Sequence, residues 1–342
     1  MKIAIVASPV APLVPAQTGG AQAFVCDLAL GLVGRGHDVT LCCAEGSNVP
    51  GVRLFMVPAP ADAARALVMP AGRVPAPAPG VVRALDAMFE SIRSGGFDVI
   101  SQHALDAPAF ELGRGMPILH TLHLPPLVPA VVGAASSVEP ARLATVSSSC
   151  QAAWRSAGVE VGHVLRNGVG ELADVATPVE RAALVAGRIS WEKGIEDAIA
   201  AAHAAGLAVR VAGAHYDPDY EVDLSHAQYA GALPRDGVRR LMAASAVTVC
   251  AVRWEEPFGM VAAEAQMAGC PVAAYRRGAL PEVVEEGAGG FLAEPDDVDG
   301  LRRAIEQCLV LDRDAIRAGA RRRLGMEGAL ERYELALARA AR

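Results

Sequence analysis

The sequence predicts an α/β fold with two domains, each built from βα units around a parallel sheet. Its 342 residues exceed what one hydrophobic core usually organises, which favours two domains. Short apolar runs alternate with alanine-rich helical stretches along nearly the whole chain, and this alternation is typical of parallel sheets. The polar stretch 170–180, which contains Pro178, interrupts the alternation and is the best candidate for a linker.

In the first half, apolar runs predict strands, and runs of good helix formers predict helices. The expected strands are 2–7, 39–43, 54–57, 98–101, 117–122 and 144–146, and the expected helices are 20–34, 81–94 and 148–156. The segment 58–80 is rich in proline, which disfavours helix and strand interiors and predicts a loop excursion.

The second half repeats the same rhythm. The expected strands are 183–186, 208–212, 246–250 and 272–274, and the expected helices are 195–205, 235–244, 260–267 and 297–311. A last helix is expected at about 327–342. No internal repeat beyond this βα rhythm is visible.

Composition excludes several classes of protein. Hydrophobic residues make up 52% of the chain, largely because of alanine, and the longest apolar run, 241–252, is too short to span a bilayer. The chain carries a net charge of −7 and no basic run stronger than 321–323, which argues against a nucleic-acid partner. A basic amphipathic face is also missing, which argues against stable membrane association.

The cysteines and the N-terminus indicate a compartment. Seven cysteines are scattered without metal-ligand or redox spacing, which suits small core residues in a reducing environment. The first residues, 1–7, lead straight into Pro9 and are interpreted as a strand, not a signal peptide. We therefore expect a cytoplasmic protein.

The most informative motif places two acids, Glu256 and Glu264, eight positions apart. Glu256 follows a predicted buried strand, and Glu264 lies inside the helix that starts after Gly259. The N-terminus of that helix offers unpaired N–H groups and partial positive charge, which suit a phosphate. Acids near a helix start are also common for dipole reasons alone. Here, Glu256 is placed to bind sugar hydroxyls and Glu264 a ribose diol.

A second motif follows the first strand of the second half. Arg188 and Lys193 lie five residues apart between a strand and a helix, where they can clamp a diphosphate and stabilise the charge of a leaving phosphate. A solvated loop with ordinary charges is the alternative.

The first half contributes glycines and histidines. Gly19 and Gly20 join the first strand to its helix and let backbone N–H groups approach a phosphate or sugar, or simply form a flexible turn. His120 and His123 end a strand on opposite faces, and alternation alone does not choose between them. His103 ends another strand.

The segment 255–273, with its Pro-Phe-Gly turn and Gly-Cys-Pro-Val end, resembles the retaining glycosyltransferases of family 4. Their fold, GT-B, has two Rossmann-like βαβ domains facing each other across a cleft. The segments 144–149, 165–169, 187–194 and 278–284 also match the family, and the donor motifs fall in the expected order. The resemblance covers essentially the full chain. It departs at Gly170, where the family usually has an acid, and at Ala251 and Val252, where it usually has Pro-Ser.

The resemblance implies an acceptor-side domain at 1–170, with the helix 327–342 packing back on it, and a donor-binding domain at 171–326. It selects His123 as the histidine beside the anomeric carbon and makes His120 a packed residue. The catalytic residues it implies are His123, Arg188, Lys193 and Glu256. The donor-binding residues it implies are Gly19, Gly20, Arg188, Lys193, Glu256, Phe258, Gly259, Met260, Val261 and Glu264.

The activity implied is retaining, metal-independent transfer of a hexose from a UDP-, GDP- or dTDP-sugar, with no separate cofactor. The compact length suits a small-molecule or natural-product acceptor, as in an antibiotic pathway. The base, sugar, acceptor and oligomeric state are left open by the sequence. Two other classes are a sugar-nucleotide epimerase of the same fold and a non-catalytic nucleotide-sugar binder.

Overall fold

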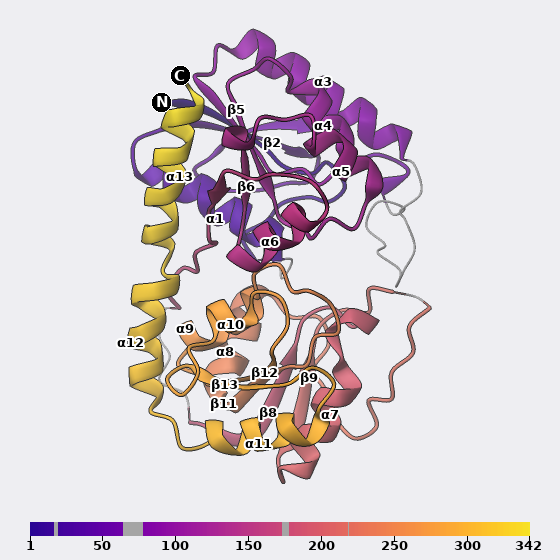
Figure 1. Cartoon of the computed structure of the whole chain (residues 1–342), viewed down its shortest axis with the longest axis vertical. Helices are drawn as coiled ribbons and strands as arrows, with labels where there is room; N and C mark the ends of the chain where they lie inside the picture. The colour runs from indigo at the N-terminus through magenta and orange to yellow at the C-terminus, as the bar shows by residue number, and fades with distance from the viewer. Residues whose placement is uncertain (17–19, 64–77, 173–177, 218) are drawn as a thin grey trace. The chain divides into compact units, whose positions relative to one another are not determined.

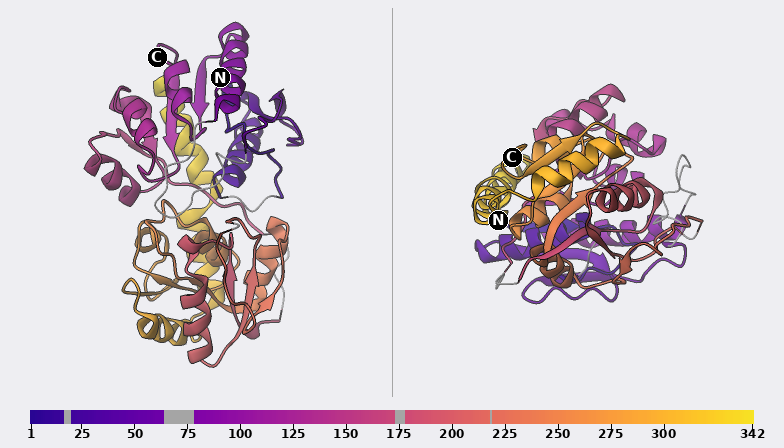
Figure 2. Two further views of the ribbon diagram at one scale, coloured as in Figure 1. Left: turned by 90° about the vertical axis from the view of Figure 1, so that its right-hand side faces the viewer. Right: turned by 90° about the horizontal axis from the view of Figure 1, so that it is seen from below.

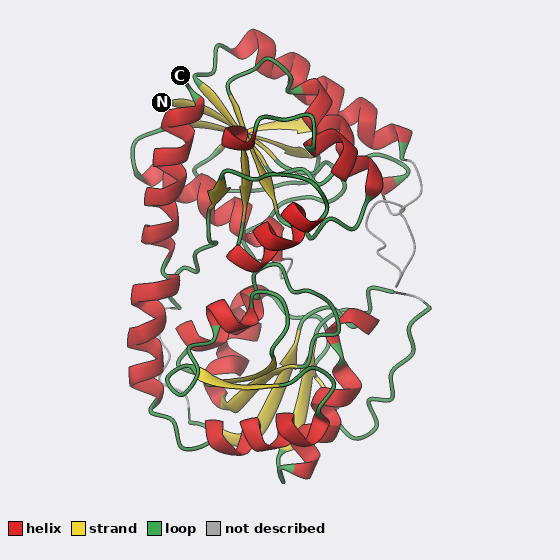
Figure 3. Ribbon diagram, viewed as in Figure 1, coloured by secondary structure: helices red, strands yellow, loops and turns green. Residues whose placement is uncertain are grey.

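The computed structural model describes residues 1–16, 20–63, 78–172, 178–217 and 219–342. These residues form two compact units (Figure 1). The N-terminal unit contains Met1–Gly168 and Met326–Arg342, and the C-terminal unit contains Val169–Gly325. Each unit holds one sheet with helices packed on both of its faces (Figures 2 and 3). The predicted α/β fold class is confirmed.

The sheet of the N-terminal unit has seven parallel strands in the order β3-β2-β1-β4-β5-β6-β7. The strands are β1 Lys2–Val6, β2 Asp38–Ala44, β3 Arg53–Val57, β4 Val99–Gln102, β5 Ile118–Leu122, β6 Leu143–Thr145 and β7 His163–Val164. The chain order reverses between the neighbours β1 and β4. Ligands of parallel α/β sheets bind outside the carboxyl ends of the strands at such a reversal.

Strand alternation sends the apolar side chains of this sheet into two cores. Ile3 and Ile5 pack with α1, whereas Ala4 and Val6 pack with α3. The helices are α1 Gly20–Gly34, α3 Pro79–Gly95, α4 Ala107–Leu112, α5 Pro129–Ala135, α6 Ser148–Ser156 and α13 Met326–Ala340.

The last helix, α13, packs on the N-terminal unit beside α1, although about 300 residues separate them (Figure 1). Its buried residues Leu330, Tyr333 and Leu337 share a core with α1. Gly31 of α1 permits the close approach, because a Cβ there would lie 2.6 Å from the side chain of Leu330. Arg35, just after α1, forms ion pairs with glutamates of α13.

The C-terminal unit has six parallel strands in the order β10-β9-β8-β11-β12-β13, with the reversal between β8 and β11. The strands are β8 Glu180–Ala186, β9 Ala208–Ala212, β10 Gln228–Tyr229, β11 Ser245–Cys250, β12 Val272–Tyr275 and β13 Gly290–Ala293. The helices are α7 Ile195–Ala204, α8 Arg235–Ala244, α9 Met260–Met267, α10 Leu280–Val283, α11 Val298–Cys308 and α12 Arg313–Leu324.

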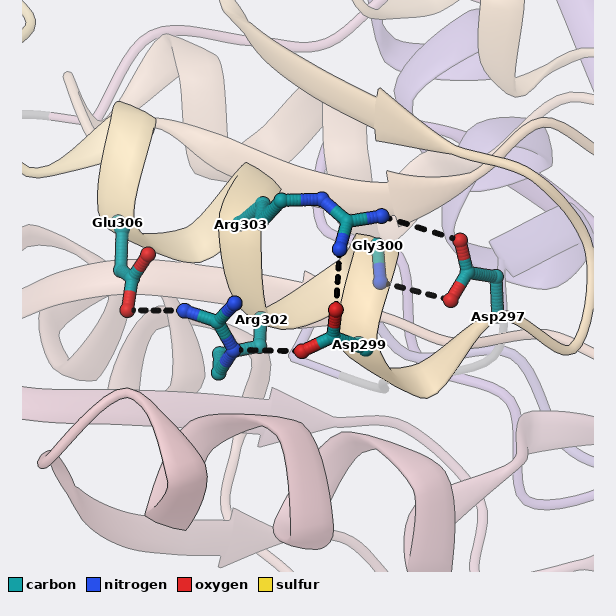
Figure 4. A network of polar contacts seen from close by, with 6 residues as sticks. All are labelled: Asp297, Asp299, Gly300, Arg302, Arg303 and Glu306. Carbon is teal, nitrogen blue, oxygen red and sulfur yellow. Dashed lines mark hydrogen bonds and ion pairs between the residues drawn. The ribbon is translucent and has the colours of Figure 1, made fainter.

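The start of α11 illustrates the surface of this unit (Figure 4). Asp297 caps the helix by accepting a hydrogen bond from the backbone N–H of Gly300 at 2.8 Å. Arg302 pairs with Asp299 at 2.8 Å and with Glu306 at 2.6 Å, and Arg303 also contacts Asp299. These ion pairs are solvent-exposed and organise the helix surface.

Most predicted elements are confirmed. The helices at 20–34, 148–156, 235–244 and 260–267 have the predicted bounds. The predicted loop 58–80 is wrong at its end, because Pro79 and Gly80 begin α3, where proline suits the first helical turn. Its residues 64–77 lie outside the described part of the chain. All seven cysteines are buried thiols, as expected of small core residues.

The elements that the sequence did not predict are α4, α5, α12, β7, β10 and β13. The helices α4 and α5 are short and have a proline in the first turn, so they resemble turns in the sequence. The helix α12 is rich in arginine and buries only Ile316, Ala320 and Leu324.

Candidate functional site

The reversal point of the C-terminal sheet brings together the two motifs that the sequence singled out. Arg188 lies just beyond the end of β8, and Glu256 lies in the loop that follows β11. Strands β8 and β11 are neighbours in the sheet, so their carboxyl ends lie side by side. Glu256 and the second cation of the motif, Lys193, meet here although 63 residues separate them.

Glycines let the loop 187–194 reach this position. Gly187 has a φ of 128° and Gly194 a φ of 59°, which glycine adopts without strain. A Cβ on Gly194 would lie 1.9 Å from the carbonyl oxygen of Ala251, so only glycine permits this contact with the end of β11.

Arg188 is held by two neighbours. Its Nη2 lies 3.0 Å from Oε1 of Glu192, and its guanidinium lies over the ring of Tyr216, 4.5 Å from the centroid. Glu192 also accepts a hydrogen bond from Oγ of Ser190 at 2.7 Å. The guanidinium remains about one-third exposed and keeps donors for a ligand.

The Glu256 carboxylate is largely buried and accepts two hydrogen bonds on the same oxygen. Nζ of Lys193 and Nε1 of Trp254 each lie 2.9 Å from Oε2. Burial raises the pKa of this carboxyl, but the charge and hydrogen bond of Lys193, with Trp254 and Arg188, outweigh burial and hold the pKa below its ordinary value. Glu256 is therefore a carboxylate at neutral pH.

The backbone around Glu256 is fixed by the segment before α10. The N–H of Ala279 donates to the carbonyl oxygen of Glu256 at 2.8 Å. A Cβ on Gly278 would lie 2.3 Å from the backbone of Glu256, which explains a glycine at that position. Beyond Glu256, Phe258 is buried and Gly259, with a φ of 91°, turns the chain into α9.

Helix α9 holds the remaining residues of the glutamate motif. Met260 is the first helical residue and is buried, whereas the neighbouring Val261 is partly exposed. Glu264 lies further along α9 and is only 8% exposed. Its Oε1 lies 2.6 Å from Nε of Arg235 in α8, so the structure pairs the predicted ribose ligand with an arginine that the sequence did not single out.

The N-terminal unit places a chain of polar side chains after β4 and at the end of β5. Nδ1 of His103 lies 2.8 Å from Nε2 of His123, and Nε2 of His103 lies 2.8 Å from Oγ of Ser101. Because each link carries one proton, the chain couples the tautomers of the two imidazoles. His103 thus contacts the histidine that the resemblance selects.

Aromatic rings surround this histidine pair. Tyr333 of α13 stacks on His103 with ring centroids 5.9 Å apart, and Phe24 of α1 lies 6.1 Å from His123. Burial lowers the pKa of His123 to about 4. Burial, together with the nearby His123, holds the pKa of His103 well below its ordinary value. Both rings are neutral at physiological pH.

His120 faces the other side of β5, as its position in the sequence predicted. It stacks on Phe110 with centroids 4.7 Å apart and an interplanar angle of 14°. Burial lowers its pKa to about 3, with a smaller effect from Arg142. The prediction of a packed histidine is confirmed.

Two residues at the start of the N-terminal unit complete the predicted set. Gly20 is the first residue of α1, whereas Gly19 lies outside the described residues.

Asp106, which the sequence did not single out, follows β4 and receives a hydrogen bond from Oγ of Ser8 at 3.4 Å. Burial raises the pKa of Asp106 to about 6, against the opposing effect of Ser8.

The described ranges hold neither a metal-binding cluster nor a membrane-spanning helix. The His, Cys, Asp and Glu side chains that the structure describes nowhere gather in threes in a way that could hold a metal ion. No described helix has both the length and the apolar composition that crossing a membrane requires.

Comparison with known proteins identifies the two units. Residues 18–170 match the model of Glycosyltransferase Family 4, and residues 177–323 match the model of Glycosyl transferases group 1. A glycogen synthase of Mycobacterium tuberculosis is 33% identical over 139 residues, which are 37% of this chain and 33% of that protein. A D-inositol 3-phosphate glycosyltransferase of Nocardioides is 42% identical over 81 residues, 22% of this chain and 17% of that protein. The matches thus span a third or less of these relatives.

Solved structures show the same fold over almost the full length. AviGT4, a glycosyltransferase involved in avilamycin A biosynthesis, has a TM-score of 0.74 at 24% identity and covers 99% of this chain and 98% of its own. Anabaena Alr3699/HepE in complex with UDP-glucose has a TM-score of 0.72 at 20% identity and covers 99% and 100%. With both halves matched by glycosyltransferase models and the whole chain by this architecture, the chain belongs to the group 1, family 4 glycosyltransferases of the GT-B fold.

Proposed function

We propose that this protein transfers a sugar from a nucleoside-diphosphate sugar to an acceptor hydroxyl and retains the anomeric configuration. The observation that carries the proposal is the ion pair of Lys193 and Glu256 at the reversal point of the C-terminal sheet, with Arg188 near enough for its charge to lower the pKa of Glu256. Two cations suit a diphosphate, and a fixed carboxylate suits sugar hydroxyls. Family membership supports the same assignment.

The leaving diphosphate would be stabilised by charges of the chain itself. Arg188 offers a planar fork and Lys193 a mobile point charge. The backbone N–H groups at the start of α9, after Gly259, add a third source of positive potential. Phe258, Met260 and Val261 flank this helix start. We therefore propose that transfer needs no metal ion or other cofactor and survives excess EDTA. Loss of activity on chelation, restored by Mg²⁺ or Mn²⁺, would contradict this.

In the proposed step, the bond between the anomeric carbon and the leaving phosphate oxygen breaks on the same face on which the acceptor oxygen bonds to that carbon. The acceptor proton passes to the departing phosphate. Glu256 orients the sugar and does not attack it, in line with a carboxylate already held by Lys193 and Trp254.

The N-terminal unit would serve the acceptor side. His123 is neutral and supplies a hydrogen bond to a sugar or acceptor hydroxyl without adding charge, and the N-terminal end of α1 at Gly20, with Gly19 before it, would approach the donor. Glu264 would bind the ribose. A UDP-, GDP- or dTDP-sugar is the proposed donor, and a small natural product in the cytoplasm is the proposed acceptor. The likeness to AviGT4 supports this choice of acceptor class.

The test is a screen of nucleotide sugars with and without acceptors. Release of nucleoside diphosphate that depends on an acceptor supports transfer, and the configuration of the product decides retention. With donor alone, an epimerised sugar would indicate an epimerase instead. Tight donor binding without turnover over a broad acceptor panel would indicate a non-catalytic binder.

A further inference from the structure

The starting observation is that one carboxylate oxygen serves two donors. Oε2 of Glu256 accepts from Lys193 and from the indole N–H of Trp254, both at 2.9 Å. The Lys193 ammonium also lies over the Trp254 ring, 5.2 Å from the centroid. The three side chains therefore form one contact group.

Binding of the nucleotide sugar would separate Lys193 from Glu256 and Trp254. Lys193 has a flexible stem and three donor hydrogens, so it can turn toward a diphosphate. Glu256 would then lose its nearest cation while remaining largely buried. A buried carboxylate without a donor is costly, and its position would no longer be defined. The hydrogen-bond donor to Glu256 that does not depend on Lys193 is the indole N–H of Trp254.

The loop around Trp254 is anchored independently of the ligand. The N–H of Arg253 donates to the carbonyl oxygen of Glu192 at 2.9 Å. The Arg253 guanidinium lies 2.9 Å from Asp197 and 3.3 Å from Glu196, both at the start of α7. This bracing fixes the backbone on the N-terminal side of Trp254, so the indole can hold Glu256 while Lys193 moves.

We propose that Trp254 is a positioning residue for the sugar of the donor: its indole N–H keeps Glu256 in place once Lys193 has turned to the diphosphate. The inference rests on the proposed function of this site. It makes Trp254 important for the sugar-bearing donor and unimportant for the bare nucleoside diphosphate.

The test compares Trp254→Phe with wild type. Phenylalanine keeps an aromatic ring at this position and removes the N–H together with the five-membered ring of the indole. Calorimetry is run with UDP, GDP and dTDP, each alone and as its glucose ester. For the pair that wild type binds, Trp254→Phe is expected to weaken the nucleotide sugar by about tenfold, the worth of one hydrogen bond to a charged group. The bare diphosphate should change by less than about twofold.

Two controls separate positioning from a structural role. Val310→Ala alters an exposed apolar residue of the same unit, beyond the end of α11, and we expect no change with either ligand. In a Glu256→Ala background, which removes the accepting oxygens, Trp254→Phe should add little, because the indole acts through the carboxylate. Equal weakening of both ligands, no weakening at all, or full additivity in the double variant would overturn the proposal.

A different result would show that the proposed function itself is wrong. If wild type binds none of these nucleotides, the donor-site assignment is wrong, and the role of Trp254 is then read from a titration of the Glu256 carboxyl by NMR. Trp254→Phe should raise the pKa of Glu256, because the carboxylate loses a donor. An unchanged pKa would overturn the positioning role on its own.

Discussion

The two units share one architecture, but the side chains at the carboxyl ends of their strands differ in charge. In the C-terminal unit, the polar groups after β8 and β11 are ions in pairs, as Lys193 is with Glu256 at 2.9 Å. In the N-terminal unit, β4 and β5 are each followed by a neutral imidazole, His103 and His123, and the two are linked at 2.8 Å. The same sheet architecture therefore supports a charged cluster in one unit and a neutral histidine pair in the other.

The difference comes from what surrounds each group. The C-terminal groups have partners of opposite charge close by, so the charged forms survive burial. The histidines are enclosed by Phe24 and Tyr333, and burial favours their neutral forms. A charged site suits a diphosphate, and a neutral site suits hydroxyl groups, which is the division of labour we propose.

The largest expected effect tests the buried pair of the charged site. Glu264→Ala removes the carboxylate that balances Arg235, so we expect the free energy of unfolding to fall by about 3 kcal/mol, together with weaker nucleoside-diphosphate binding. Denaturant titration measures the first effect and calorimetry the second. A further Arg235→Met change should restore part of the stability. A loss below about 1 kcal/mol would contradict the account of this pair.

The next effect concerns turnover. Arg188→Ala and Lys193→Ala should each slow transfer about 10²–10³-fold, by analogy with the loss of a donor to a developing negative charge. The matched control is Arg302→Ala on α11, which removes an arginine with the same i,i+4 pairing to a glutamate as Arg188. We expect the control to retain wild-type turnover. Wild-type rates in either site variant would show that the clamp is wrongly assigned.

A smaller effect tests the neutral site through pH. Unfolded histidine titrates near 6.5, whereas folded His123 titrates near 4 and His120 near 3. Between these values the unfolded chain binds more protons, so stability falls as pH falls. From pH 7 to pH 5 we expect a loss of about 2 kcal/mol per buried histidine. His123→Asn and His120→Asn should each remove about that much of the pH dependence; parallel losses in wild type and variants would count against buried neutral histidines.

The smallest effect is expected at the surface. Arg303→Ala breaks the exposed contacts to Asp297 and Asp299 shown in Figure 4, and it should change the free energy of unfolding by less than about 1 kcal/mol. Denaturant titration of this variant beside Glu264→Ala gives the contrast between exposed and buried ion pairs. Equal losses in the two variants would remove that contrast.

Much of the fold could be predicted because βα units carry local signals. The bounds of α1, α6, α8 and α9 follow from runs of helix formers. Short elements such as α4, β10 and β13 could not, since a few residues carry no clear period. The link from Ser101 to His103 was available in principle, because alternate strand positions share a face.

The remaining partners in the site depend on tertiary packing. Tyr333 reaches His103 only because α13 returns to the N-terminal unit, and Arg235 meets Glu264 only because α8 packs beside α9. The spacing of these residues in the sequence does not predict the contacts. Trp254 lies two residues before Glu256, yet its role depends on where the indole N–H points.

The division between a charged and a neutral site is tested most directly by calorimetric titration of nucleoside diphosphate into two variants, Lys193→Ala and His123→Ala. The account predicts that Lys193→Ala weakens binding about thirtyfold, the worth of a charge-assisted contact to phosphate, while His123→Ala stays within about twofold of wild type. Equal losses in both variants, or a loss confined to His123→Ala, would contradict the placement of the diphosphate in the C-terminal unit.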